Sequence, residues 1–170
     1  MIVEETLAAE ARGMRRFLRA PIAGWMAFAG LGAALCVGAL ALASRLTAIP
    51  YWQIPFITSI ALVMGAPRSE PARPRALIGG HLTAALAGYA VLMVGGSSPI
   101  LAAIAVGLAV IAMLRLKVFH PPAAVDAFLV ANLGLKIGYL FSVILLGAVL
   151  LAGFAFVWRK LADGLAPRPT

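Results

Sequence analysis

The sequence predicts an all-α protein, a polytopic bundle of transmembrane helices, and three observations lead to this fold class. Of the 170 residues, 63% are hydrophobic and only 12% are charged, and the mean hydropathy is +1.01. Several apolar stretches run uninterrupted for lengths that suit a membrane span. The basic residues, which give a formal charge of +8, gather at the ends of these stretches, where topology signals and lipid-headgroup contacts occur. We therefore expect an integral membrane domain and no binding of nucleic acid.

Six apolar segments follow one another between a charged prefix and a polar tail. The prefix, residues 1–19, has the pattern of an amphipathic helix on the membrane surface. The membrane domain is expected at 20–160 and the tail at 161–170. The segments have approximate bounds 22–44, 51–66, 76–94, 99–114, 121–135 and 138–158. The second and fifth are short and begin at prolines, which suit the first turn of a helix.

The placement of lysine and arginine predicts an orientation. If all six segments cross and the N-terminus is cytoplasmic, only Arg45 and Lys136 of the fourteen basic residues lie outside, as the positive-inside rule requires. Re-entrant second and fifth segments would move the basic residues of 68–75 outside, which fits less well. That alternative stays open, because sixteen helical residues cover only ~24 Å of a ~30 Å hydrocarbon core. We expect a bacterial inner-membrane protein with both termini in the cytoplasm.

An internal repeat relates the two halves of the chain. A shift of 67 residues places Pro55 on Pro122 and Ser59 on Asp126. Each half then contains a long segment, a short Pro-initiated segment and another long segment. Since three crossings reverse the direction of the chain, the two three-segment repeats would be inverted. Inverted repeats with Pro-interrupted short segments indicate a transporter whose site lies near the membrane midplane.

The tripeptide His120-Pro121-Pro122 opens the fifth segment. A helix start carries unpaired N–H groups and a partial positive charge, and both attract an anion. Because the prolines have no N–H, the donors would be the backbone amides of Ala123 and Ala124 and the imidazole of His120. The alternative is that the prolines only mark a helix boundary.

Three further polar residues are candidates for the same site. His81 follows two glycines in the third segment, and a histidine changes charge between about pH 5 and 8. Asp126 lies about 600° around a helix from His120, so it should reach another segment. Its potential partners are Arg75, Arg115, Lys117 and His81. We expect the substrate site to contain His120, Pro121, Pro122, Ala123, Asp126, Arg75, His81 and Ser59.

Two blocks of this sequence resemble the signature of the HPP family of integral membrane proteins. The first runs from His120-Pro121-Pro122 through Ala123-Ala124, where the family often has glycine. The second runs from Pro74-Arg75 to Gly79-Gly80-His81, and the order and spacing of the blocks agree with the family. The resemblance covers residues 22–158. It implies a transporter, and nitrite transport is associated with plastid and cyanobacterial relatives.

The sequence contains no signature of an enzyme. It has no G-x-S-x-G, H-E-x-x-H or glycine-rich phosphate loop, and two histidines with one cysteine are poor material for a metal site. We expect no catalytic residue, metal or cofactor. The leading hypothesis is a proton-linked transporter or channel for a small anion such as nitrite, and the alternative is a non-transporting membrane scaffold or sensor subunit. Expected partners are lipids, the anion and a second copy of the chain in a homo-oligomer.

Overall fold

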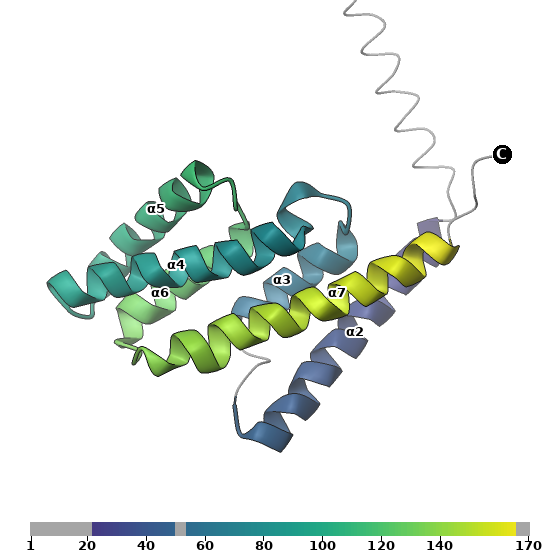
Figure 1. Cartoon of the computed structure of the whole chain (residues 1–170), viewed down its shortest axis with the longest axis horizontal. Coiled ribbons are helices and arrows are strands. Elements are labelled where there is room, and N and C mark those ends of the chain that lie inside the picture. The colour runs from purple at the N-terminus through teal and green to yellow at the C-terminus, as the bar shows by residue number, and fades with distance from the viewer. Residues whose placement is uncertain (1–21, 50–53, 166–170) are drawn as a thin grey trace, which may run out of the picture.

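The computed structural model describes residues 22–49 and 54–165, and all regular structure in that part of the chain is helical (Figure 1). The six α-helices are α2 (Ile22–Thr47), α3 (Ile54–Gly65), α4 (Pro74–Gly95), α5 (Pro99–Arg115), α6 (Ala124–Leu133) and α7 (Leu146–Leu165). Two 3₁₀ turns, η1 (Glu70–Ala72) and η2 (Pro121–Ala123), precede α4 and α6, and a π-helical segment, η3 (Leu140–Leu145), continues into α7. The all-α prediction is confirmed.

Three helices are long and apolar enough to cross a membrane: Gly24–Thr47, Pro74–Gly95 and Leu140–Leu161. The helices of the second, fourth and fifth segments are apolar but shorter. The predicted amphipathic prefix lies outside the described residues. The last helix continues to Leu165, so it enters the stretch that we expected to be a polar tail.

Local sequence explains where several helices begin and end. Pro74 and Pro99 stand at the first positions of α4 and α5, where a missing N–H costs nothing. The Ser98 hydroxyl caps α5 by accepting a hydrogen bond from the Leu101 amide at 3.1 Å. Gly134 ends α6 in the left-handed conformation with φ of 60°, which glycine adopts without steric cost.

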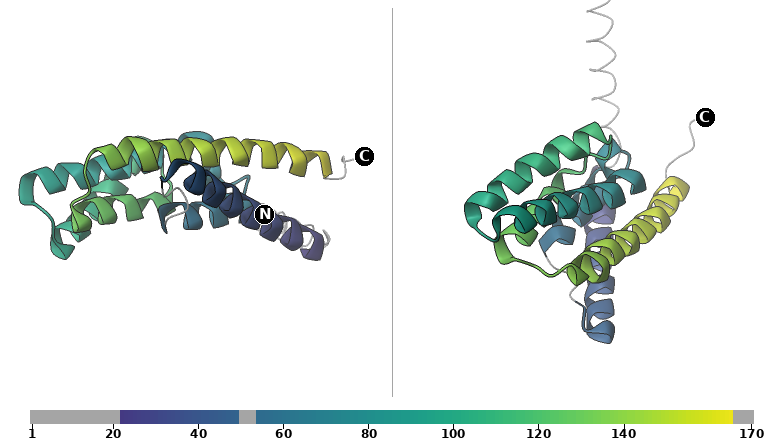
Figure 2. Two further views of the ribbon diagram at one scale, coloured as in Figure 1. Left: turned by 90° about the horizontal axis from the view of Figure 1, so that it is seen from below. Right: turned by 60° about the vertical axis from the view of Figure 1, so that its left-hand side comes forward.

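The helices pack as two groups of three, and each group takes its third helix from the other half of the sequence. Helices α4, α5 and α6 form one group, and α2, α3 and α7 form the other (Figure 1). Thus α4 leaves the first repeat to pack on α5 and α6, and α7 leaves the second repeat to pack on α2 and α3. Figure 2 shows α7 running from beside the α4–α6 group to the end of the molecule at which α2 begins, and α4 and α7 meet where the groups join.

The element bounds support the 67-residue repeat. Shifting α3 by this amount gives 121–132, and the η2–α6 unit covers 121–133. Shifting α4 gives 141–162, and the η3–α7 unit covers 140–165. Gly80 and Gly147 correspond in the repeat, and each allows close approach to the short segment of the other half. A Cβ on Gly80 would lie 2.6 Å from the Cβ of His120, and one on Gly147 would lie 2.5 Å from the Phe56 ring.

The connections between helices fall into two sets at opposite ends of the segments. The Ser97 hydroxyl donates to the Asn132 carbonyl at 3.2 Å, so α6 returns the chain to the end at which α5 begins. The start of α2 and the end of α7 lie at a common end, where Phe28 stacks on Trp158 at 4.3 Å between ring centroids (Figures 1 and 2). This alternation is the one that six crossing segments require.

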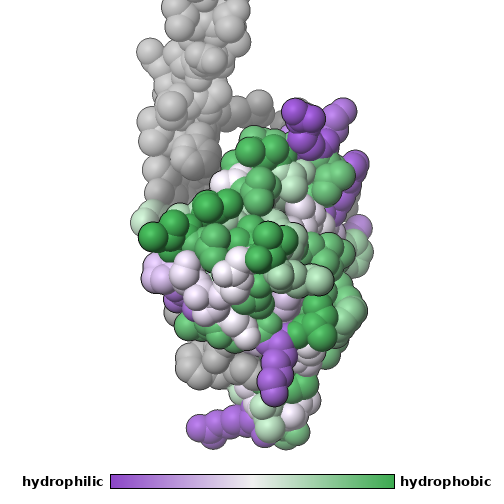
Figure 3. Space-filling model, turned by 90° about the vertical axis from the view of Figure 1, so that its left-hand side faces the viewer, coloured by the Kyte–Doolittle hydropathy of each residue, from purple (hydrophilic) through white to green (hydrophobic). Residues whose placement is uncertain are grey.

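The outer surface is apolar. Figure 3 shows hydrophobic side chains over much of one end of the molecule, with hydrophilic residues at its margins. Met93 is 86% exposed and Val94 is 93% exposed. Such side chains are suited to contact lipid tails.

Candidate functional site

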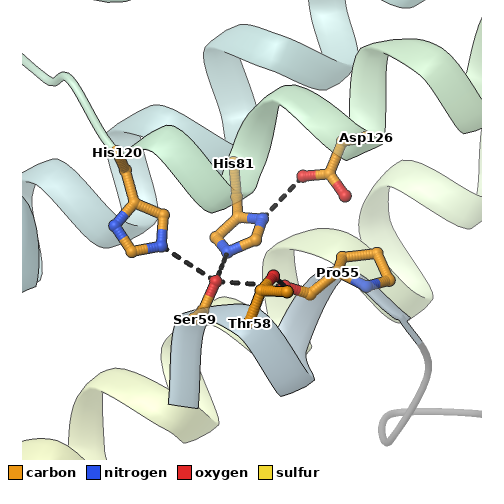
Figure 4. A network of polar contacts seen from close by, with 6 residues as sticks. All are labelled: Pro55, Thr58, Ser59, His81, His120 and Asp126. Carbon is orange, nitrogen blue, oxygen red and sulfur yellow. Dashed lines mark hydrogen bonds and ion pairs between the residues drawn. The ribbon is translucent and has the colours of Figure 1, made fainter. Parts of the chain in front are cut away.

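Four polar side chains from different parts of the sequence meet inside the protein (Figure 4). Ser59 lies on α3, His81 on α4 and Asp126 on α6, while His120 stands directly before η2. All four residues have no exposed surface. Polar groups at membrane depth are costly unless they are paired, so these side chains must satisfy one another. We call this set of four residues the buried polar chain.

Hydrogen bonds connect the buried polar chain from one end to the other. Oδ2 of Asp126 lies 2.6 Å from Nδ1 of His81, and Nε2 of His81 lies 2.9 Å from Oγ of Ser59. The same Oγ lies 2.9 Å from Nε2 of His120. The chain ends where Nδ1 of His120 donates to the Pro71 carbonyl at 2.7 Å. Every imidazole nitrogen therefore has a partner.

Close packing holds the two imidazoles in place. Gly80 lets α4 approach the backbone that carries His120, and Gly79 contacts Val118 in the same way. The ring of Phe56 lies 5.0 Å from the ring of His81, which in turn lies 5.1 Å from the ring of His120. The side chains are fixed by helix packing as well as by hydrogen bonds.

The buried polar chain lies at the interface between the repeats. Ser59 and Asp126, which the 67-residue shift superposes, bind the two nitrogens of one imidazole, His81. The partner that sequence left open for Asp126 is therefore His81. Arg75, Arg115 and Lys117, the other three candidates, are exposed.

One oxygen atom of the buried polar chain has no hydrogen-bond donor among the described residues. Oδ1 of Asp126 is buried and has no hydrogen-bond partner among the described residues. Leaving a buried acceptor unpaired costs free energy, about 1–3 kcal/mol for a neutral group and more for a charged one. Such atoms call for an explanation in terms of function or protonation.

Comparison with known proteins agrees with the two signature blocks. The sequence profile of the HPP transmembrane region matches residues 19–167, nearly the whole chain. The chain belongs to the HPP family. The two HPP blocks thus supply His81 and His120, the two imidazoles of the buried polar chain.

A curated transmembrane protein of Dictyostelium discoideum is 35% identical to this HPP chain over 78 residues. The match covers 44% of this chain and 25% of the relative, so the chain spans about a quarter of the relative's length. No solved structure matches this HPP chain.

The start of the HPP tripeptide helix differs from the sequence expectation. The amide of Ala123 donates to the His120 carbonyl at 3.0 Å, and the amide of Ala124 bonds to the carbonyls of Pro121 and Pro122. The expectation of unpaired amides at this helix start is wrong, because the 3₁₀ turn η2 folds their hydrogen bonds back onto the preceding residues. Pro121 is exposed, Pro122 is half-buried and Ala123 is buried.

Arg75 lies apart from the buried polar chain. It stands in the first turn of α4, as expected for the HPP block, but its side chain is exposed. The structure joins it to neither histidine nor to Asp126. Its role as a site residue stays a prediction.

Sequence reasoning missed the Pro71 carbonyl, because a backbone acceptor carries no residue-type signal.

A separate cavity between α2 and α7 has an apolar lining and touches no member of the buried polar chain; its lining residues are Cys36, Ala39, Leu40, Ala43, Leu150 and Phe154. Within the described ranges, no three His, Cys, Asp or Glu side chains are grouped to hold a metal ion.

Proposed function

We propose that this HPP protein is a transporter or channel that links movement of a small anion across the bacterial inner membrane to movement of a proton, and that it is not an enzyme. The observation that carries the proposal is the buried polar chain at the interface of two inverted repeats. Transporters of this kind place their sites at such interfaces. Intramembrane chains of Asp and His are typical of proton relays.

The linkage to an anion follows from charge. A proton added to a buried imidazole creates a cation in a medium of low dielectric constant, which a small anion can neutralise. The Ala123 and Ala124 amides are bonded within the 3₁₀ turn, and both nitrogens of each histidine are bonded as well. An imidazole N–H would therefore hold the anion only after one of the histidine hydrogen bonds opens. Nitrite is the first candidate on the family resemblance, and as a weak-acid anion it suits proton-linked uptake.

The alternative of a non-transporting scaffold or sensor subunit also has an observation in its favour. Neighbouring side chains and the Pro71 carbonyl occupy both nitrogens of each histidine. In a scaffold, these hydrogen bonds only need to satisfy the buried polar groups. A transporter must break some of them during its cycle.

Uptake of nitrite, nitrate, formate and chloride into proteoliposomes, with and without a pH gradient, tests the proposal. We expect His120→Ala and Asp126→Asn to reduce pH-dependent uptake while the protein still folds. Thr58→Ala is the matched control, because Thr58 donates to the Pro55 carbonyl at 3.2 Å on the same helix but is bonded to neither histidine. Normal uptake and pH dependence in His120→Ala, or no uptake of any anion by the unmodified protein, would favour the scaffold.

Arg75→Lys tests the remaining predicted site residue. Lysine keeps the charge but cannot reproduce the guanidinium fork. Reduced uptake in this variant would indicate an anion contact at the exposed start of α4. Uptake equal to that of the unmodified protein would limit the anion site to the buried groups.

The exposed apolar faces also bear on the expected partners. Ile104 and Ile111 on α5 are 51% and 56% exposed. These side chains would contact either lipid tails or a second copy of the chain, and we propose a homo-oligomer. Chemical cross-linking in native membranes distinguishes the two.

A further inference from the structure

We propose that the Ser59 hydroxyl relays a proton between the two histidines, and that the structure holds one proton more than an ionised Asp126 with two neutral imidazoles would carry. The role of this relay in transport rests on the proposed function. The proton count rests only on the geometry of the buried polar chain. The argument begins at the end of the chain where the direction of the hydrogen bond is fixed.

That end is the contact between His120 and Pro71. A carbonyl oxygen only accepts hydrogen bonds, so Nδ1 of His120, 2.7 Å away, carries the hydrogen. In a neutral His120 the other nitrogen, Nε2, is then an acceptor. The Ser59 hydroxyl must then donate the hydrogen bond to Nε2 of His120.

The Ser59 hydroxyl has one hydrogen and three neighbours that compete for it. They are the Pro55 carbonyl at 3.1 Å and Nε2 of His81 and of His120, each at 2.9 Å. If Asp126 is ionised and His81 is neutral, the His81 hydrogen points from Nδ1 to the carboxylate, and its Nε2 is also an acceptor. The single Ser59 hydrogen can serve only one of the three contacts, so in the other two a lone pair of the Ser59 oxygen would face a lone pair of the neighbouring acceptor. One additional proton on Nε2 of His81 satisfies both imidazole contacts and leaves opposed only the longer contact with the Pro55 carbonyl.

The pair of Asp126 and His81 is the favourable place for the additional proton. Their 2.6 Å contact accommodates either an imidazolium with a carboxylate or a neutral imidazole with a carboxylic acid. Both arrangements have no net charge, which a buried site favours. In both, Nε2 of His81 carries a hydrogen and donates it to Ser59, whose own hydrogen is free to bond to His120.

The tyrosine with a hydrogen bond of known direction, Tyr89, does not supply the additional hydrogen. Besides His81, the tyrosines Tyr89 and Tyr139 interact electrostatically with Asp126. The Tyr89 hydroxyl donates to the Lys136 carbonyl at 2.8 Å. Its hydrogen is thereby directed away from Ser59 and from both histidines.

Transfer along the chain requires two coupled steps at Ser59. The Nε2–H bond of His81 breaks as a new O–H bond forms on Ser59, and the original O–H bond breaks as its proton bonds to Nε2 of His120. Serine keeps one hydrogen throughout, and one positive charge moves to His120. When the bond from His120 to the Pro71 carbonyl opens, water at the 66–73 loop accepts the Nδ1 proton. That loop is exposed at Glu70 and Arg73.

Nitrogen NMR of ¹⁵N-histidine-labelled protein in lipid bilayers tests the proton count. The chain has only two histidines, and labelled carbonyls of glycine or phenylalanine distinguish Gly80-His81 from Phe119-His120. We expect hydrogen on Nε2 of His81, hydrogen on Nδ1 of His120 and a bare Nε2 on His120. A bare Nε2 on His81, or a bare Nδ1 on His120, would overturn the proposal.

Exchange of the His81 Nε2 hydrogen with D₂O tests the relay without any need for transport. We expect Ser59→Ala to slow this exchange by about a hundredfold, the scale of acid–base catalysis by one group, and Thr58→Ala to leave it unchanged. Equally fast exchange in Ser59→Ala would refute the relay. If Ser59→Ala does not fold, the proton count in the unmodified protein still decides the proposal. Absent anion uptake with the expected NMR pattern would refute the proposed function and leave the relay standing.

Discussion

Replacing Gly80 by alanine tests the close approach on which the buried polar chain depends. The new Cβ would lie 2.6 Å from the Cβ of His120 and 3.0 Å from the Val118 carbonyl oxygen. Non-bonded carbon atoms are most stable at about 3.5–4.0 Å, so the overlap is about 1 Å. Neither neighbour is the end of a flexible side chain, so α4 must move away from the segment that carries His120.

The magnitude follows from two opposing effects. Overpacking of this kind costs about 1–3 kcal/mol, whereas alanine in a helix is favoured over glycine by about 1 kcal/mol. Gly153→Ala in α7 has the second effect alone, because nothing lies within 4 Å of its Cβ. Gly80→Ala should therefore be less stable than Gly153→Ala by about 1–3 kcal/mol. Gly147→Ala should fall between them, because the Phe56 ring that it meets can tilt.

Reversible unfolding in mixed detergent micelles measures these differences. The three variants should rank Gly153→Ala, Gly147→Ala and Gly80→Ala in order of decreasing free energy of unfolding. A Gly80→Ala protein as stable as Gly153→Ala would refute the close approach of α4 to His120. Loss of the expected histidine NMR pattern in Gly80→Ala alone would support it.

Three other outcomes are expected. Single cysteines at Glu70 and Ser97, in a cysteine-free background, should react with impermeant reagents from opposite sides of the membrane, with Glu70 cytoplasmic; labelling of both from one side contradicts six crossings. Gly88→Ala should be less stable than Gly153→Ala by about 1–3 kcal/mol, because its Cβ would meet the α6 backbone at 2.9 Å; a free energy of unfolding equal to that of Gly153→Ala would contradict that contact. Asp126→Ala should cost about 3–5 kcal/mol by leaving His81 without its partner, and a loss below 1 kcal/mol in the same assay would show that the pair is not buried as described.

Hydropathy and proline positions were sufficient to predict most of the fold. Five of the six apolar segments lie within three residues of their helices at both ends, because burial in lipid requires long apolar runs and prolines fix helix starts. The sixth begins as predicted but ends seven residues later, at Leu165. The 67-residue repeat was visible because Pro55 and Pro122 begin equivalent helices. The exchange of α4 and α7 between the two packing groups was not predictable, since it depends on which apolar faces meet and the faces are chemically alike.

The candidate site was predictable in its members more than in its connections. Ser59, His81, His120 and Asp126 were all expected, because polar side chains are rare in apolar segments and therefore conspicuous. Periodicity showed that Asp126 and His120 do not share a helix face, but it left four partners open for Asp126. The sequence does not predict the bonding of the Ala123 and Ala124 amides, since a 3₁₀ turn that begins at two prolines has the same sequence pattern as a regular helix start.

The separation of His81 and Asp126 in the sequence has a consequence for biogenesis. The two residues are 45 positions apart and come from different repeats. During synthesis, His81 enters the membrane well before its carboxylate partner exists, and α4 must wait for α5 and α6 before its packing surface is covered. Until then, Nδ1 of His81 has no carboxylate partner within the bilayer, where an unpaired polar group is costly. Synthesis of α6 supplies Asp126, so the contact that fixes the His81 imidazole in the mature protein also marks the point at which α4, α5 and α6 can pack together.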